Sequence, residues 1–537
     1  MTFHRNLWTR PSTLALALAF AAACSSQDTN SLTGGSSSGG TPPGTTPDGG
    51  SADDGGGPPG PPPGGTLADE QFPPDLLKPY TGPPNTDYEN TFVTYLQLKA
   101  RVVQLFADTG LGGGTDAYFT SKIALLGGAD FKTTFNEARV ASPDFLVALD
   151  GIAKEACARA ATNKTGPFAG TDPNAPAGGD NALATALYQK LLLRSPSAQE
   201  VTDGVALVST IKPLSTDAAS AWAGLCEGLV RHPDFLFTLP PSVSVVTGAD
   251  KERLQLVKLS LDLAGRLPLD TELASLAGKS VADKVTFYLG TPEFKDFYFH
   301  RTQVRTESVG TVESAEPARL WTYLMLNGAP MQEVMTADYT IDANFNRIAR
   351  GPEHGKSGVL TMPGFIKTKP GFPHYNYAAR VMTDYMGQLF EITPAILKGR
   401  IDATASSTVQ PGSLCISCHG ILTPLEYQRR RWADDGTFHA TDATGAAIDD
   451  TDMGLVPDYP YKGAGIEAFA VTAVKKEKFF RQTFQAQFLF MLGRQMRFDQ
   501  DERTIYLALW NTAFQKNGDL REIVKVIAST VPGYLGK

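Results

Sequence analysis

Three residues in the carboxyl-terminal part of the chain have the types and the spacing needed to attach a haem. Cys415 and Cys418 are separated by two residues, and His419 follows directly. This Cys-x-x-Cys-His pattern is the attachment signature of c-type haem. Two thiols at this spacing can reach both vinyl-derived carbons of one porphyrin, while the adjacent imidazole binds the iron. We therefore expect one covalent haem c, with Cys415 and Cys418 as thioether sites and His419 as the proximal iron ligand.

Other chemistries of a Cys-x-x-Cys pair fit the sequence less well. A thioredoxin-like redox pair is expected in a βαβ context, and no such pattern surrounds Cys415. A structural zinc site needs four ligands, and no second pair of Cys or His lies at zinc-finger spacing. Attachment of haem c takes place outside the cytoplasm, so the expectation also requires an exported chain.

The second axial ligand of such a haem has several candidates. Met453 lies in a glycine-containing loop after the motif, where its thioether could reach a haem face. His439, Met491, Met496, an upstream residue such as His374, and an open coordination position are the alternatives. Met491 could equally be a core residue, and His439 a solvated loop residue. We take Met453 as the first candidate.

A basic and aromatic stretch, Arg429–Trp432, follows the motif closely. Arg430 and Trp432 could donate hydrogen bonds to the haem propionates, which need cations or an indole N–H where they are partly buried. The alternative is a solvated basic helix end without a ligand. Pro424 follows soon after His419, which departs from the pattern of small class I cytochromes.

The first 24 residues have the features of an exported bacterial lipoprotein. Arg5 and Arg10 precede a short apolar run, Leu14–Ala23, and Cys24 follows directly. The run is too short to span a bilayer and has the length of a signal-peptide core. The arrangement resembles a lipobox, which implies cleavage before Cys24 and acylation of that residue. The alternative is an ordinary secreted protein that is cleaved elsewhere.

The segment after Cys24 is rich in Gly, Pro and Ser as far as residue 66 and nearly lacks apolar side chains. Such a segment cannot bury enough surface to offset its ordering entropy, so we expect a disordered tether. Ser25 and Ser26 stand where an acidic residue would favour the inner membrane, so the outer membrane is the expected location, on its periplasmic or surface face. A formal net charge of −8 argues against a nucleic-acid partner.

Two of the five cysteines remain after these assignments. Cys157 and Cys226 each lie in an Ala- and Gly-rich segment of helical character. Export favours a disulfide between them, which would stabilise the first helical unit. The alternative is two buried free thiols.

Apolar residues recur at steps of three and four residues through most of the chain, which predicts amphipathic helices. One such helix is expected between residues 87 and 108. Another carries aromatic residues on one face from residue 480 and should end at Gly493. Asp499-x-x-Glu502 and Asp519-x-x-Glu522 should each open a further helix as a capping box.

Part of the helical region is duplicated. The pattern Arg-x-Pro-x-x-x-Glu occurs at Arg194–Glu200 and again at Arg266–Glu272. Each copy precedes a similar phrase, His232–Phe235 and Thr291–Phe294, and Ala141–Phe145 is a weaker third example of that phrase. We expect a helix, a tight turn and a second helix in each copy, with the Arg capping the first helix or pairing with the Glu.

The chain is therefore predicted to be mainly α, with duplicated helical units followed by a helical, cytochrome c-like haem module. About three folding units are expected from the length. The predicted segments are a lipoprotein signal peptide (1–23), a lipid anchor and disordered linker (24–66), an amino-terminal helical domain (67–240), a second helical domain (241–395) and a haem-binding module (396–537).

Three phrases also carry a resemblance to a known family. Leu259–Pro268, Gly358–Phe365 and Phe490–Arg494 resemble parts of large exported proteins of unknown function that were first noticed in planctomycetes and that carry cytochrome-like modules. The resemblance covers roughly residues 180–537. It implies a helical fold and a haem, but no reaction.

The first functional hypothesis is a mono-haem cytochrome lipoprotein that exchanges electrons with an unidentified partner in the cell envelope. A second is a helical scaffold or binding lipoprotein of an envelope complex, with a structural haem module. A third is a haem enzyme with an open distal site. The sequence favours an electron-transfer protein over an enzyme, and it identifies no electron donor, acceptor or substrate.

Overall fold

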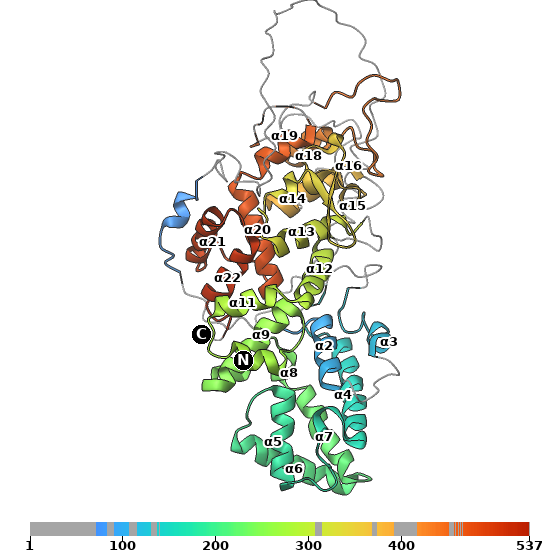
Figure 1. The fold of residues 1–537 in the computed structure, drawn as a ribbon, viewed down its shortest axis with the longest axis vertical. Helices are drawn as coiled ribbons and strands as arrows, with labels where there is room; N and C mark the ends of the chain where they lie inside the picture. Colours follow the sequence, from blue (N-terminus) through green and yellow to red (C-terminus); the bar gives the residue numbers. More distant parts are fainter. Residues whose placement is uncertain are drawn as a thin grey trace, which may run out of the picture.

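The computed structural model describes residues 71–82, 91–106, 115–129, 137–138, 140–306, 314–367, 373–390, 416–450, 456, 458–459, 461, 463 and 465–535. These residues form a mainly helical protein, as predicted, and also contain a two-stranded sheet. Figure 1 shows an elongated molecule, with the amino-terminal helices at one end and the helix that follows Cys415 near the other.

The amino-terminal unit is a bundle built around α4 and α7. These two helices pack closely and are joined by the predicted disulfide between Cys157 and Cys226, both fully buried. Trp222 of α7 and Phe145 of α4 belong to the same core. The helices of this unit are α2 (Tyr95–Phe106), α3 (Thr115–Thr120), α4 (Pro143–Asn163), α5 (Gly179–Leu192), α6 (Ala198–Ile211), α7 (Ala218–Val230) and α8 (Pro233–Leu236).

The middle of the chain contains helices and the small sheet. Strands β1 and β2 are antiparallel, with Tyr339 opposite Ala349 and Ile341 opposite Arg347. The elements are α9 (Gly248–Ala264), α10 (Asp270–Leu276), α11 (Val281–Leu289), α12 (Pro292–Thr306), α13 (Glu316–Asn327), α14 (Glu333–Thr336), β1 (Tyr339–Ile341), β2 (Arg347–Ala349), α15 (Pro363–Ile366) and α16 (Pro373–Arg380). A π-helical turn, Val381–Tyr385, continues α16.

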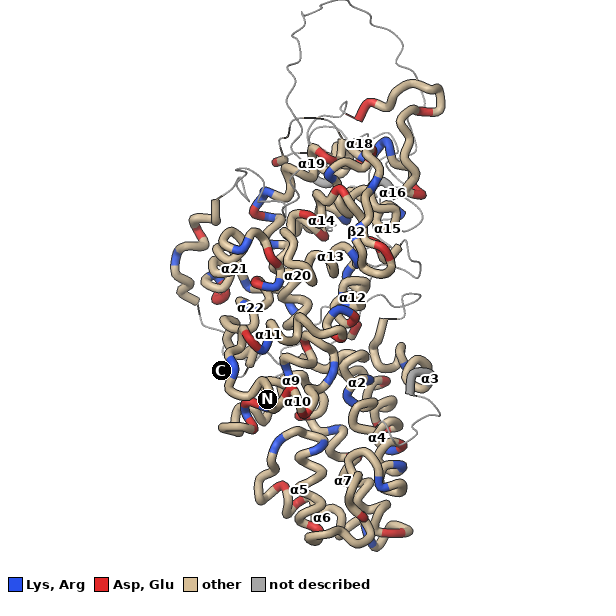
Figure 2. The backbone as a smooth tube through the Cα atoms, viewed as in Figure 1, with Lys and Arg blue, Asp and Glu red and all other residues tan. Residues whose placement is uncertain are grey.

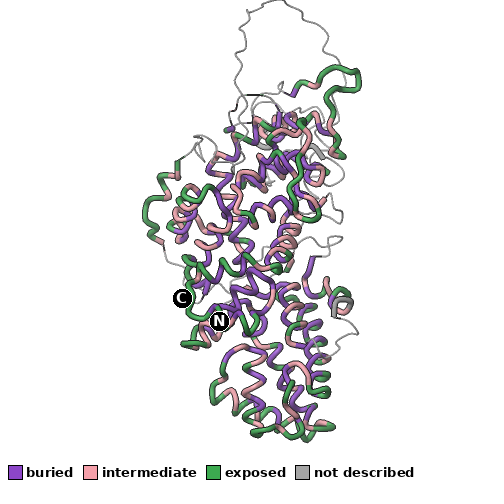
Figure 3. The backbone as a smooth tube through the Cα atoms, in the orientation of Figure 1, coloured by how far each residue is buried: buried purple, intermediate pink, exposed green. Residues whose placement is uncertain are grey.

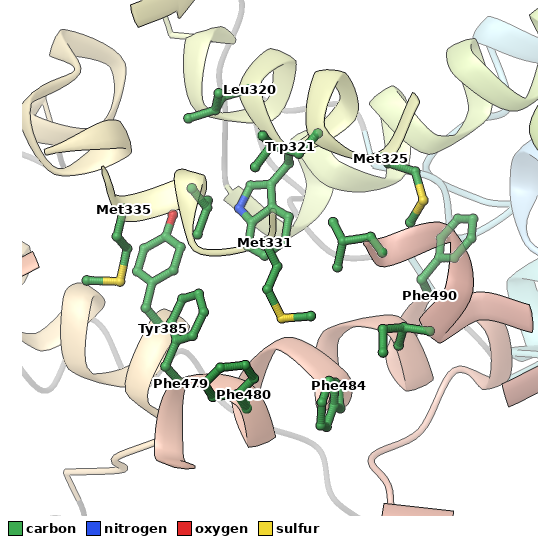
Figure 4. Packing of buried hydrophobic residues seen from close by; sticks show 14 of the residues in the cluster. Leu320, Trp321, Met325, Met331, Met335, Tyr385, Phe479, Phe480, Phe484 and Phe490 are labelled. Carbon is green, nitrogen blue, oxygen red and sulfur yellow. The ribbon is translucent and has the colours of Figure 1, made fainter. Parts of the chain in front are cut away.

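The carboxyl-terminal helices pack against the middle of the chain and share its core. In Figure 4, Trp321 of α13 and the nearby Met331 face Phe480 and Phe484 of α20. Figure 3 shows the resulting buried interior running through this part of the molecule. The helices are α18 (Ile416–Gln428), α19 (Gly465–Ala473), α20 (Glu477–Leu492), α21 (Arg503–Gln515) and α22 (Leu520–Thr530).

Short helical turns connect these elements. They are η1 (Pro74–Leu77), η4 (Gly166–Phe168), η5 (Lys212–Leu214), η6 (Pro241–Ser244), η7 (Pro352–His354) and η8 (Gly358–Thr361). In the described part of the chain, the two larger hydrophobic clusters fall between residues 92 and 236 and between residues 256 and 535. The predicted boundary between residues 395 and 396 lies outside the described residues, and Tyr377 and Leu425 on its two sides belong to one cluster.

The predicted repeat has the same geometry in both copies. Arg194 Nη1 donates to Glu200 Oε2 at 2.9 Å, and Arg266 Nη1 donates to Glu272 Oε2 at 2.8 Å. Of the two roles expected for each Arg, pairing with the Glu is therefore the one observed. In the first copy, the Arg also contacts the acid of the phrase His232–Phe235. The Asp234 carboxylate lies 2.8 Å from Arg194 Nε.

A third copy of this turn, which the sequence reasoning missed, joins α20 to α21. Arg494 Nη1 donates to Glu502 Oε2 at 3.0 Å, and the backbone N–H of Arg497 donates to the same oxygen at 2.6 Å. Gly493 has φ +70° and ends α20, as predicted. A left-handed residue at this position turns the chain so that the next side chain, the Arg, can point back toward the second helix.

One predicted helix start is wrong and the other is right. Helix α21 begins at Arg503, because the Glu502 carboxylate is engaged by arginines of the turn and does not close a capping box with Asp499. Asp519 does cap α22, since its side chain accepts a hydrogen bond from the backbone N–H of Arg521. The predicted capping box does not form there, because the Glu522 carboxylate pairs with Lys525 at 2.7 Å.

Candidate functional site

The Cys-x-x-Cys-His motif lies where α18 begins. The helix starts at Ile416, so Cys418 and His419 fall in its first turn. Cys415 and Met453 lie outside the described residues, as does Cys24, and the side chains of Cys418 and His419 are not described either. The geometry of the predicted iron site therefore belongs to a part of the chain outside the described residues.

Helix α18 is held by two neighbouring helices. It packs against α16 on one side and α19 on the other. Pro424 lies inside the helix. Because a proline has no N–H to donate, it removes one hydrogen bond from the helical ladder. Leu425 is fully buried in the core, so the helix that carries the motif is anchored by its apolar face.

The predicted propionate donors lie at the opposite end of α18 from His419. Nine residues of helix at 1.5 Å each put about 14 Å between His419 and Gln428, and Arg430 lies beyond that end. Arg430 Nη1 donates to the carbonyl oxygen of Asp449 at 2.7 Å. Figure 2 shows basic residues near α18 together with acidic residues of the following loop.

Trp432 is a packing residue in this structure. It is buried, with its ring 4.6 Å from the ring of His354 and 5.1 Å from the ring of Phe438. An isolated bridge also pairs Trp432 with Phe438. Through these contacts, Trp432 packs the loop after α18 against the segment around His354.

A cavity of about 280 Å³ lies between α18 and this loop. It is lined by Glu426, Arg429, Arg430, Trp432, Asp442 and Ile448. Arg429 is almost fully buried, pairs with Asp434 at 2.9 Å, and lies 5.1 Å from the ring of Tyr377. The lining therefore contains two basic and two acidic residues, and the charge of Arg429 is also balanced by Asp434.

The sequence reasoning did not identify the polar cluster around His354, which lies against Trp432. Arg350 donates to His354 Nδ1 and, at 2.8 Å, to Thr361 Oγ1. Because a guanidinium can only donate, Nδ1 is the acceptor and the proton of the neutral ring sits on Nε2. Burial, followed by the charge of Arg350, lowers the pKa of His354 to about 4. The only signal in the sequence was the adjacent phrase Gly358–Phe365.

Two buried amide groups near α18 lack a hydrogen-bond partner. Asn376, on α16, has an unpaired Nδ2 and is 8% exposed. Gln428, the last residue of α18, has an unpaired Oε1 and is 2% exposed. Buried polar groups are nearly always hydrogen-bonded. The Asn376 Nδ2 donor and the Gln428 Oε1 acceptor are therefore available to a ligand or to a residue outside the described part of the chain.

The alternative axial ligands differ in their surroundings. Met491 and Met496 are buried in the large core, as the packing interpretation of Met491 expects. His439 is exposed, and its backbone N–H donates to the carbonyl of Arg431. The side chain of His374 is not described.

Within the described residues, no cluster of at least three His, Cys, Asp or Glu side chains could hold a metal ion. No helix in the described part of the chain has both the length and the apolar character needed to cross a membrane. Comparison of the chain with protein-family models, with curated proteins and with solved structures gives no match.

Proposed function

We propose that the protein is a c-type cytochrome lipoprotein that carries one covalent haem and transfers electrons in the cell envelope. The observation that carries this proposal is the sequence spacing of Cys415, Cys418 and His419, of which the last two lie in the first turn of α18. Two thiols at this spacing, with an imidazole directly after the second, are the pattern that two thioether bonds to one porphyrin and one axial iron ligand require.

The surroundings of α18 are compatible with a haem. The unpaired Nδ2 of Asn376, on the helix packed against α18, is a buried donor suited to an anionic acceptor such as a propionate. The core residues on α18 would hold the motif in a fixed position. A bound haem c would supply a reversible one-electron couple, which the amide and apolar side chains around α18 do not provide.

The location is part of the same proposal. Cys24 would carry the lipid, and the Gly-, Pro- and Ser-rich segment to residue 66 would tether the helical body to the outer membrane. The partner would be a redox protein on the same face of that membrane. A scaffold with a structural haem, and a haem enzyme with an open iron site, are the competing functions.

The test is expression of the full chain together with a haem c assembly system. We expect covalent haem after denaturation, one per chain, a low-spin spectrum and a reversible one-electron couple. Cys415→Ala and Cys418→Ala should each impair covalent attachment, and the double variant should abolish it. The double variant Cys157→Ala/Cys226→Ala is the matched control, because it removes two cysteines at a distance from α18 and should keep the haem.

The possible contrary results separate the competing functions. A mature protein without covalent haem would overturn the proposal outright. High-spin haem that binds peroxide would replace electron transfer with an enzyme, and haem without a reversible couple would support a structural role.

A further inference from the structure

A second cavity lies between the amino-terminal unit and the middle of the chain, far along the sequence from the haem motif. Its volume is about 450 Å³, within the range of roughly 300–1,000 Å³ that is typical of small-molecule sites. Its walls come from the end of α2, the turn η4, the last turn of α5, and the α9–α10 segment. Both copies of the repeated Arg–Glu turn border it, at Leu193 and at Leu267.

Part of this cavity is apolar. It is lined by leucines from separate elements, Leu105 of α2, Leu193 after α5, Leu267 before α10 and Leu273 of α10. Leu267 is buried, and Leu105 and Leu193 pack against its cluster. Leu105, Leu193 and Leu273 keep part of their surface exposed. An apolar ligand group would remove that surface from water.

The polar part of the cavity carries more positive than negative charge. Lys190 and Arg253 line it, and Asp270 is the acidic residue among the described lining residues. Lys190 Nζ donates to the carbonyl oxygens of Pro167 and Ala169, each at 3.0 Å, so an ammonium with three donors keeps one for a ligand.

Arg253 is the strongest indication of a ligand. It is half-buried in the cavity wall and forms no hydrogen bond or ion pair with another described residue. By contrast, Arg194 and Arg266 of the nearby repeated turns each hold a carboxylate through two parallel bonds. A guanidinium in this setting matches the geometry of a carboxylate group.

We infer that this cavity binds a small monocarboxylate with an apolar tail. The carboxylate would pair with Arg253 and take the remaining donor of Lys190, and the tail would cover the leucines. The excess of one positive charge in the lining fits a monoanion. A small inorganic anion would satisfy the cations but would leave the leucines in water.

The test uses octanoate as the probe and isothermal titration calorimetry on the purified full chain. We expect saturable binding with one site per chain. Acetate, which lacks the tail, and octanol, which lacks the charge, should each bind at least about tenfold more weakly, because each loses one half of the interaction. Arg253→Gln should weaken octanoate binding about tenfold or more. Leu273→Trp should fill the space for the tail and abolish binding.

Lys251→Gln is the matched control, since it removes one positive charge on α9 two residues from Arg253, at a position that does not line the cavity. It should leave the affinity within about twofold. Circular dichroism and thermal unfolding would establish that each variant is folded. The inference is overturned if octanoate shows no saturable binding, if acetate or octanol binds as well as octanoate, or if Lys251→Gln and Arg253→Gln weaken binding equally.

Discussion

His354 shows how a single side chain can be held in one charge state by its neighbours. Its ring lies on Trp432, and its Nδ1 accepts from the Arg350 guanidinium. Glu353 Oε1 lies 3.7 Å from Nε2, too far for a strong compensating bond. Protonation would place a second positive charge beside Arg350 in a poorly solvated position, so the neutral ring is the form that the fold stabilises.

This arrangement predicts a loss of stability in mild acid. The folded pKa of about 4 lies below the ordinary value of 6.5, so only the unfolded chain takes up the proton as the pH falls between these values. Stability should therefore be intact above pH 6.5 and decrease down to about pH 4. At pH 5 the contribution of His354 is a loss of about 2 kcal/mol.

The measurement is urea unfolding of the wild type and of His354→Gln at pH 7 and pH 5. The variant should lose less stability than the wild type over this interval. His439→Gln is the control, because His439 is exposed and should behave as the wild type does. Equal losses in the wild type and His354→Gln would contradict the assigned charge state.

At the scale of elements, one helical turn is used three times to join consecutive helices. In each copy an Arg follows a left-handed residue and holds the Glu at or near the start of the next helix. The sequence pattern revealed two copies because both contain a proline two positions after the Arg, at Pro196 and Pro268. In the third copy Met496 takes that position and the Arg–Glu spacing is longer, so only the shared geometry identifies it.

The third copy can be tested by removing its central charge. Glu502 is almost fully buried and pairs with both Arg494 and Arg497. Glu502→Gln should destabilise the protein by about 2–3 kcal/mol, because a buried charge that pairs with two arginines of the turn is removed. Urea unfolding measures this change. Asp501→Asn is the control, and it should have a smaller effect because Asp501, which pairs with Arg497 at 2.8 Å, is 17% exposed whereas Glu502 is 1% exposed. A loss no larger than that of the control would show that the ion pairs of this turn contribute little.

At the scale of the whole molecule, the two larger cores are stabilised differently. The amino-terminal core contains the Cys157–Cys226 disulfide, and the larger core is instead closed by contacts between distant segments. Lys258 and Asp262 of α9 form a buried ion pair at 2.9 Å, and Tyr534 near the carboxyl terminus donates to the same carboxylate. This contact ties the end of the chain to its middle.

The disulfide should therefore act on one part of the molecule. It closes a loop across 69 residues, which corresponds to about 4 kcal/mol in the chain-entropy model. In the Cys157→Ala/Cys226→Ala variant, hydrogen exchange should accelerate in α4 and α7 and remain nearly unchanged in α20 and α22. Exchange that increases equally throughout would show that the two cores unfold as one unit.

The sequence alone determined the features that depend on local chemistry. The helical class, the end of α20 at Gly493 and the position of the first two turns follow from periodicity and from short-range geometry. The sequence left two roles open for the Arg of each turn, and the structure shows that it pairs with the Glu. The disulfide was predictable because export and the assignment of the other cysteines left one pair. The haem motif and the lipid signal remain predictions, because their decisive residues lie outside the described part of the chain.

The tertiary structure decided which distant segments share a core. Helix α11 packs on α22, and Asp262 meets Tyr534, although these residues are far apart in the sequence. The cluster at His354 also joins distant segments, because Trp432, from the segment after α18, packs against the His354 ring. Apolar periodicity shows that a helix buries one face, but many faces are chemically alike. Only the packed structure determines which face meets which, and therefore where the polar clusters and the cavities form.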